Sequence, residues 1–166
     1  MIPRAFFITS GIGVDSEPAI AFDLALRDAG IGECNLVEVS SILPVDAVEI
    51  DRKHASIKPG TITFCVLSRA DGASGDVIGA GVGYGWLGGA LREASEPDTA
   101  NRAYGIICEH HGHHSRAFLA DKIQEKLDKM AAMRELNVLT RKRAVESVEV
   151  ERGKFGSVVV ALVFLS

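Results

Sequence analysis

Two adjacent serines, Ser40 and Ser41, are the residues of this sequence whose type and position most clearly suggest chemistry. They lie in the run EVSSILP, after the apolar segment CNLVEV and before Pro44. An ordinary turn here would be expected to carry Gly, Asn or Asp as well as proline, because those residues supply the unusual backbone angles of turns. Two hydroxyl groups at the end of an expected strand therefore indicate a chemical role.

Two carboxylates and an amide could share in that chemistry. Glu109 ends the apolar run YGIIC, where partial burial would raise the pKa of its carboxyl group, although an exposed glutamate at a strand end is the alternative. Asp23 lies on the apolar face of an expected helix, either to receive a cationic group or to pair with Arg27 one turn later. Asn35 begins an expected strand and could be a turn residue.

A histidine cluster follows Glu109 and comprises His110, His111, His113 and His114. In an extended segment Glu109, His111 and His113 would lie on one face, because side chains alternate along a strand. Imidazole and carboxylate groups could then bind zinc. Solvated histidines at a strand end are the simpler interpretation, so we expect no metal site.

The segment GYGWLG has the Gly-x-Gly-x-x-Gly spacing of a dinucleotide-binding loop at Gly83, Gly85 and Gly88. Such a loop should open a helix, whereas Gly79 and Gly81 precede this one and the following ASEPDTANRAYG is expected to be a loop. We interpret the glycines as marking a strand that other backbone approaches closely, or a bulge.

The elements that must position these residues follow from the apolar periodicity. Strands are expected at residues 6–13, 35–39, 61–68, 77–86 and 104–109, and in a closing pair joined by RGKFG. A first helix is expected over residues 16–30, with Ser16 as its N-cap and Gly30 just past its end.

A second helix is expected over residues 115–136, with one apolar stripe made by Phe118, Ile123, Leu127, Met130 and Met133. The segment 44–59 reads as a long exposed loop that could be functional. Because strands outnumber helices and separate them, we expect an α/β sandwich in which helices cover mainly antiparallel sheets.

Bulk properties exclude several classes of protein. A chain of 166 residues that is 47% hydrophobic can bury one core, so residues 1–166 are expected to form a single domain. The net charge of −4 offers no basic face for nucleic acid. The apolar stretch 157–165 is too short for a membrane helix. Three cysteines without Cys-x-x-Cys spacing suit a reducing cytoplasm better than a disulfide framework.

In the order of its sequence motifs, the chain resembles the pyruvoyl-dependent arginine decarboxylases. The resemblance rests on AFDLALRDAGIGECNLVEVSSILP, a glycine-rich strand pair, GIICEHHGHHS before a long helix, and a closing hairpin. Its most specific element is Asn35 to Pro44. Members of this family cut themselves between two serines, which here implies cleavage between Ser40 and Ser41 into chains 1–40 and 41–166.

The resemblance implies a covalent cofactor made from the chain itself, with no metal and no pyridoxal phosphate. The Ser41 hydroxyl would attack the Ser40 carbonyl to give an ester, and elimination followed by hydrolysis would leave a pyruvoyl group at residue 41. That ketone condenses with the α-amine of the substrate and accepts the electrons left when CO₂ departs. The expected reaction converts L-arginine to agmatine.

The same resemblance implies roles for individual residues. Glu109 would be the proton donor, Asn35 would support self-cleavage and the active site, and Asp23 would face the substrate guanidinium. Leu26 would line that pocket, and main-chain groups of residues 32–34, from Gly32 to Cys34, would add hydrogen bonds. The implied fold is a four-layer αββα sandwich that assembles into trimers or hexamers with active sites between subunits.

The histidine cluster departs from the family pattern, in which Tyr and other residues are more usual at these positions. Two alternatives to arginine decarboxylation are open. One is decarboxylation of another amino acid by the same chemistry. The other is a non-catalytic trimer that binds a metal or another ligand through His110 to His114.

Overall fold

The computed structural model describes residues 1–90 and 102–166. Part of the segment expected to be a loop after GYGWLG lies outside these residues. The elements, in chain order, are β1 (Ala5–Asp15), α1 (Pro18–Asp28), β2 (Asn35–Glu38), β3 (Ile42–Leu43), β4 (Val48–Glu49), a 3₁₀ turn (Arg52–His54), β5 (Ile62–Ala73), β6 (Val77–Ala90), β7 (Arg102–Gly112), α2 (Arg116–Ala132), β8 (Leu136–Glu149) and β9 (Phe155–Leu165).

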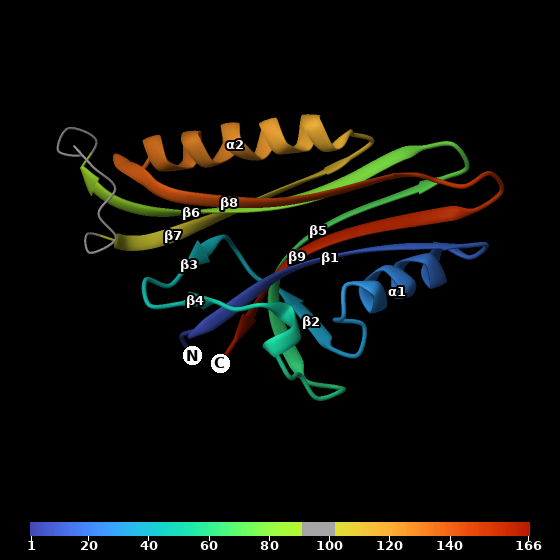
Figure 1. Ribbon diagram of the computed structural model, residues 1–166, viewed down its shortest axis with the longest axis horizontal. Coiled ribbons are helices and arrows are strands. Elements are labelled where there is room, and N and C mark those ends of the chain that lie inside the picture. Colours follow the sequence, from blue (N-terminus) through green and yellow to red (C-terminus); the bar gives the residue numbers. More distant parts are fainter. Residues whose placement is uncertain (91–101) are drawn as a thin grey trace.

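The described strands form two sheets that pack face to face. The first sheet has the order β2-β5-β9-β1-β4 and the second has the order β3-β7-β6-β8. Pairing is antiparallel throughout the second sheet, and in the first sheet only the short strands β2 and β4 join in parallel. In Figure 1, α1 covers the outer face of the first sheet and α2 covers the outer face of the second. This arrangement confirms the expected αββα sandwich with mainly antiparallel sheets.

Three apolar cores hold the four layers together. Between the sheets lie buried side chains such as Phe6, Val82 and Leu162. Ala25 and Val159 belong to the core under α1, whereas Ile123 belongs to the core under α2. Strand β9 is buried along nearly its whole length because it lies between β5 and β1 and is covered on both faces, which explains its continuous apolar sequence.

The glycines of β6 let α2 lie close to the second sheet. A Cβ atom at Gly81 or Gly83 would come within 2.5 or 2.4 Å of the Ile123 side chain. The expected strand is therefore confirmed, but the atoms that approach Gly81 and Gly83 most closely belong to the Ile123 side chain and not to backbone. Register shifts near Leu87 and Gly88 also show the expected irregularity. Strand β6 continues through Gly83, Gly85 and Gly88, so these glycines do not form the dinucleotide-binding loop that the sequence analysis set aside.

Both helices differ from the expectation at one end. Helix α1 has Glu17 rather than Ser16 as its N-cap, and the Asp15 carboxylate accepts the Glu17 N–H at 3.0 Å. Gly30 follows the helix with φ +73°, as expected. Helix α2 ends at Ala132 instead of Leu136, because Glu135 adopts φ +55° and turns the chain into β8.

The apolar stripe of α2 was predicted only in part. Ile123 and Leu127 are buried as expected, but Phe118 and Met133 are 45% and 81% exposed. Leu119 and Ala131 complete the buried face instead. The segment expected to be a loop at 44–59 also contains β4 and the 3₁₀ turn, because Val48 and Glu49 pair with β1.

Candidate active site

Ser40 and Ser41 lie where the chain crosses from one sheet to the other. The last contact with the first sheet is the Val39 N–H, which donates to the Cys65 carbonyl at 2.9 Å. The next residues join the second sheet, where the Ser41 carbonyl accepts the Ile107 N–H at 2.8 Å. The Ser40–Ser41 peptide bond is therefore held from both sides, with Ser40 exposed and Ser41 half-buried.

Glu109 lies close to this crossover along β7. Ser41 is anchored to Ile107, and Glu109 follows two residues later on the same face, because side chains alternate along a strand. Ile107 belongs to the core between the sheets, so the Glu109 side chain also points toward the first sheet. It is half-buried, which agrees with its position at the end of an apolar run.

Three of the residues implied by the resemblance line one pocket of about 560 Å³. Leu26 comes from α1, whereas Cys34 and Asn35 lie at the start of β2. The Asn35 side-chain amide donates to the Gly60 carbonyl at 2.9 Å. This contact ties β2 to the loop that precedes β5, so Asn35 also has a structural role.

The remaining expected residues do not line this pocket. Asp23 is exposed on α1, next to the pocket residue Phe22. The alternative role of Asp23, an ion pair with Arg27, is not formed, and Arg27 Nε lies 3.9 Å from the Glu33 carboxylate instead. Gly32 is half-buried against the Arg27 side chain. Ser40, Ser41 and Glu109 are not among the lining residues either.

Sequence reasoning did not assign four polar or aromatic residues to this pocket. They are Phe22, Glu38, Arg69 and His111. The Arg69 guanidinium lies 3.4 Å from the centre of the Phe22 ring and pairs with Asp71 at 2.9 Å. His111 carried a signal, because it follows Glu109 by two residues on the same face of an expected strand. Arg69 carried no such signal, because nothing in the sequence around it indicates that its side chain contacts Phe22 of α1.

The histidine cluster is split between different surroundings. The rings of His110 and His114 stack with centroids 5.3 Å apart, and His114 stacks on Phe118 at 4.2 Å. His111 lines the pocket, while His113 lies 3.7 Å from Asp76. In the part of the chain that the structure describes, no group of three or more His, Cys, Asp or Glu side chains is placed to hold a metal ion.

Comparison with known proteins decides the family. A sequence model of the pyruvoyl-dependent arginine decarboxylases matches residues 5–166. The chain belongs to this family. It is similar to pyruvoyl-dependent arginine decarboxylase 1 of Archaeoglobus fulgidus, with 40% identity over 116 residues that cover 68% of this chain and 67% of the relative.

A second relative is pyruvoyl-dependent arginine decarboxylase 2 of Methanosarcina mazei, with 38% identity over 129 residues, or 76% of this chain and 65% of the relative. The aligned segments thus span about two thirds of these relatives.

Membership of the pyruvoyl-dependent family implies a covalent pyruvoyl group. Ser41 is the serine to which the resemblance assigns this group, and the main chain is hydrogen-bonded on each side of its peptide bond with Ser40. No helix among the described residues is long and apolar enough to cross a membrane.

Cys34 offers a chemical probe of the pocket. Burial raises the pKa of the Cys65 and Cys108 thiols to about 12, so both should resist alkylation. Cys34 is half-buried and lines the pocket. We expect iodoacetamide at pH 8 to modify Cys34 alone in the native protein, with loss of most activity, and arginine to slow the reaction. Peptide mass mapping checks this, with Cys34→Ser as the control, and equal labelling of Cys65 would contradict it.

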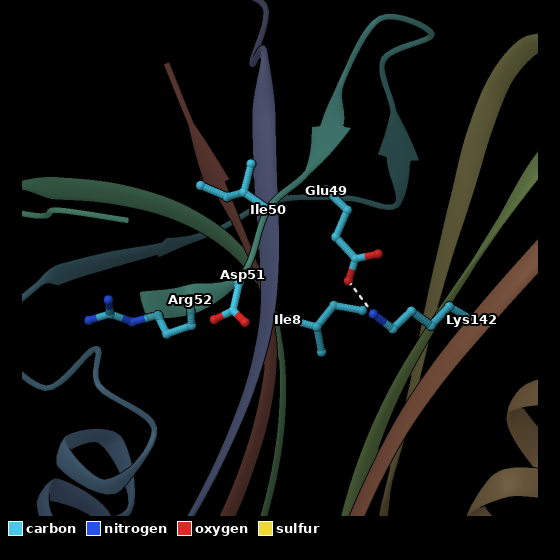
Figure 2. Close-up of a pocket in the computed structure, with 6 residues that line it drawn as sticks. All are labelled: Ile8, Glu49, Ile50, Asp51, Arg52 and Lys142. Atoms are coloured by element: carbon cyan, nitrogen blue, oxygen red, sulfur yellow. Dashed lines mark hydrogen bonds and ion pairs between the residues drawn. The ribbon is translucent and has the colours of Figure 1, made fainter. Parts of the chain in front are cut away.

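A second pocket, of about 400 Å³, lies on the other side of the sandwich between β1, β4 and β8. Figure 2 shows Lys142 reaching Glu49 there, with Arg52 directed away from the pair. The Glu49 carboxylate accepts from Lys142 at 2.6 Å and from the Tyr84 hydroxyl at 2.8 Å. Burial, together with the hydrogen bond from the Tyr84 hydroxyl to Glu49, raises the pKa of Tyr84. Since these residues join both sheets, we assign this pocket a structural role.

We expect His110 to make the free energy of unfolding depend on pH. Burial lowers the pKa of its imidazole, and the positive charges of Lys126, His114, Lys122 and His111 lower it further. The folded protein thus favours neutral His110, whereas the unfolded chain binds the proton from about pH 6.5 downward. Unfolding then takes up protons, so the free energy of unfolding should fall as the pH drops below that value.

We expect the urea midpoint of the wild type to decrease between pH 7.5 and pH 5.5, and to decrease less in His110→Gln. His54→Gln, at an exposed histidine of the 3₁₀ turn, is the matched control and should keep the full decrease. An identical decrease in His110→Gln and wild type would show that another group causes it.

Proposed function

We propose that this chain is a carbon-carbon lyase that converts L-arginine to agmatine and CO₂ with a pyruvoyl group derived from Ser41. The observation that carries the proposal is the family match over residues 5–166, which includes the Ser40–Ser41 crossover between the sheets. The half-buried residue Glu109 on neighbouring β7 supports it, because a decarboxylase needs an acid near its reacting carbon.

Self-processing would need no reactant from outside the chain except water. The Ser41 hydroxyl attacks the Ser40 carbonyl carbon, and the peptide bond is replaced by an ester. Removal of the Ser41 α-proton then expels the Ser40 carboxylate, leaving a dehydroalanine that hydrolyses to a pyruvoyl group and ammonia. Anchoring by Val39 and Ile107 on either side supports this route, because it limits the positions that the two serines can adopt.

Substrate binding would use the pocket beside this crossover. The pyruvoyl group supplies an electron sink for decarboxylation. Leu26 and Cys34 give the arginine stem an apolar wall, with main-chain groups from Gly32 onward accepting or donating hydrogen bonds. Asp23 would bind the guanidinium, since paired planar groups make strong charge-assisted hydrogen bonds. Glu109 would return a proton to the carbon that loses CO₂.

Assembly into trimers, or hexamers made from two trimers, is part of the proposal. Exposed apolar side chains surround the crossover and include Val37, Val39, Ile42, Ile62 and Phe64. Exposed apolar side chains of this kind are typical of an interface, and a neighbouring copy that covers them would shield the site from water. Three cysteines without disulfides support a reducing, cytoplasmic location.

The function is tested by intact-mass measurement and by product analysis. We expect purified protein to contain fragments that correspond to residues 1–40 and 41–166, to form agmatine from L-arginine, and to lose activity after borohydride reduction of the ketone. A cleaved protein that leaves arginine unchanged but decarboxylates another amino acid would replace the proposed substrate. A full-length, inactive chain would contradict the proposal as a whole.

Asp23→Asn tests the substrate assignment separately. Loss of the carboxylate should raise KM for arginine by about 10-fold to 100-fold, since a hydrogen bond between charged groups contributes roughly 1.5–3 kcal/mol. Asp28→Asn, at the exposed end of the same helix, is the control and should keep the wild-type KM. Steady-state kinetics check the result, and an unchanged KM in Asp23→Asn would exclude contact with the guanidinium.

A further inference from the structure

The outer edge of β7 changes partner at Glu109. Strand β3 pairs Ile42 and Leu43 with Ile106 and Gly105, and the Ile107 N–H still donates to Ser41. Main-chain groups two residues apart point to the same edge of a strand, so the Glu109 carbonyl lies on this edge beyond the end of β3. The Lys126 ammonium group fills the vacant position, because it donates to the Glu109 carbonyl at 2.8 Å.

The carbonyl of the next residue, His110, is held by a side chain from the first sheet. The Ser68 hydroxyl, fully buried in β5 of the first sheet, donates to the His110 carbonyl at 2.8 Å. The same oxygen accepts the Gly81 N–H at 3.2 Å, so one hydroxyl joins β5 to both β6 and β7. Successive carbonyls of β7, at Glu109 and His110, are therefore fixed by side chains from α2 and from the first sheet.

These two contacts differ from those of similar residues nearby. Ser157 is also fully buried in the first sheet, but its hydroxyl has no hydrogen-bond partner among the described residues. Lys129 lies one turn after Lys126 and pairs with Glu125 on the surface of α2. Burial in the first sheet is therefore not enough to bring a serine side chain to β7, and a position on α2 is not enough to bring a lysine there.

We propose that Lys126 and Ser68 are positioning residues that fix the β7 backbone at Glu109 and so set the place of its carboxyl group. The inference rests on the proposed function, in which Glu109 protonates the reacting carbon. Among the described strands, none lies beside Glu109 on this edge of β7, so the Lys126 ammonium takes over that restraint. Ser68 holds the carbonyl of His110, the residue after Glu109, at a constant distance from the first sheet.

The test compares Lys126→Met and Ser68→Ala with Lys129→Met and Ser157→Ala, each normalised to its pyruvoyl content. Because displacement of a catalytic group by about 1 Å can cost 10²-fold in rate, we expect kcat to fall by about 10-fold in each of the first two variants. KM for arginine should stay within about twofold of the wild-type value, since neither residue lines the substrate pocket. Lys126→Arg keeps a donor and should recover most of the activity.

Four outcomes distinguish the possibilities. Wild-type kcat in folded Lys126→Met and Ser68→Ala would overturn the inference. An equal loss in Lys129→Met and Ser157→Ala would also overturn it, because the effect would then be general destabilisation. If Ser68→Ala does not fold, the contrast between Lys126→Met and Lys126→Arg still decides. An inactive wild-type enzyme would instead refute the proposed function.

Discussion

Ser41→Ala is expected to remain a single 166-residue chain with no measurable decarboxylase activity. The Ser41 hydroxyl is the nucleophile of the proposed cleavage and also the oxygen that leaves with residues 1–40 in the elimination. Alanine offers neither atom, so the ester and the ketone cannot form. Denaturing electrophoresis and intact-mass measurement check the chain length, and agmatine formation checks the activity.

Ser40→Ala is the matched control, because the mechanism uses the carbonyl of Ser40 but not its hydroxyl. It should still give the two fragments, more slowly if its backbone shifts. We expect the fragments of the wild type to stay together without denaturant, since β1 pairs with β9 along Ala5–Asp15. Cleavage of Ser41→Ala at the same bond would exclude Ser41 as the nucleophile.

The fold was largely predictable from the sequence, because its layers follow from local patterns. Apolar runs and periodic stripes gave most strands and both helices, and their order gave the sandwich. The pairing order was not predictable, since it depends on contacts between distant residues. Strands β2 and β3 are separated only by Val39, Ser40 and Ser41, yet they belong to different sheets. The sequence predicted that a strand ends at Val39, but not that the chain then changes sheet.

The candidate site was predictable to a smaller extent. The family resemblance pointed to Ser41 and Glu109, and the structure brings both to one edge of β7. Glu38 and Arg69 could not be found, because the pocket forms only when α1, β2 and β5 meet. The end of α2 was missed for a physical reason: the positive φ of Glu135 is a backbone conformation that its side chain does not favour.

Glu109→Gln is expected to cleave normally but to lose about 10²-fold to 10⁴-fold in kcat, the usual contribution of a positioned acid. Glutamine has nearly the same shape and still suits a half-buried position, so the cleavage site beside Ile107 should keep its geometry. Glu151→Gln, exposed in the turn between β8 and β9, controls for loss of a negative charge and should retain wild-type kcat.

The step at which Glu109 acts can be separated from general damage to the site. If its carboxyl group protonates the carbon after CO₂ has left, a single turnover of Glu109→Gln should release CO₂ faster than agmatine. Rapid-quench measurement of both products checks this order. Equal slowing of both products would place Glu109 at or before loss of CO₂. Activity equal to the wild type would remove Glu109 from the mechanism, and with it the reason for Lys126 and Ser68 to hold this part of β7.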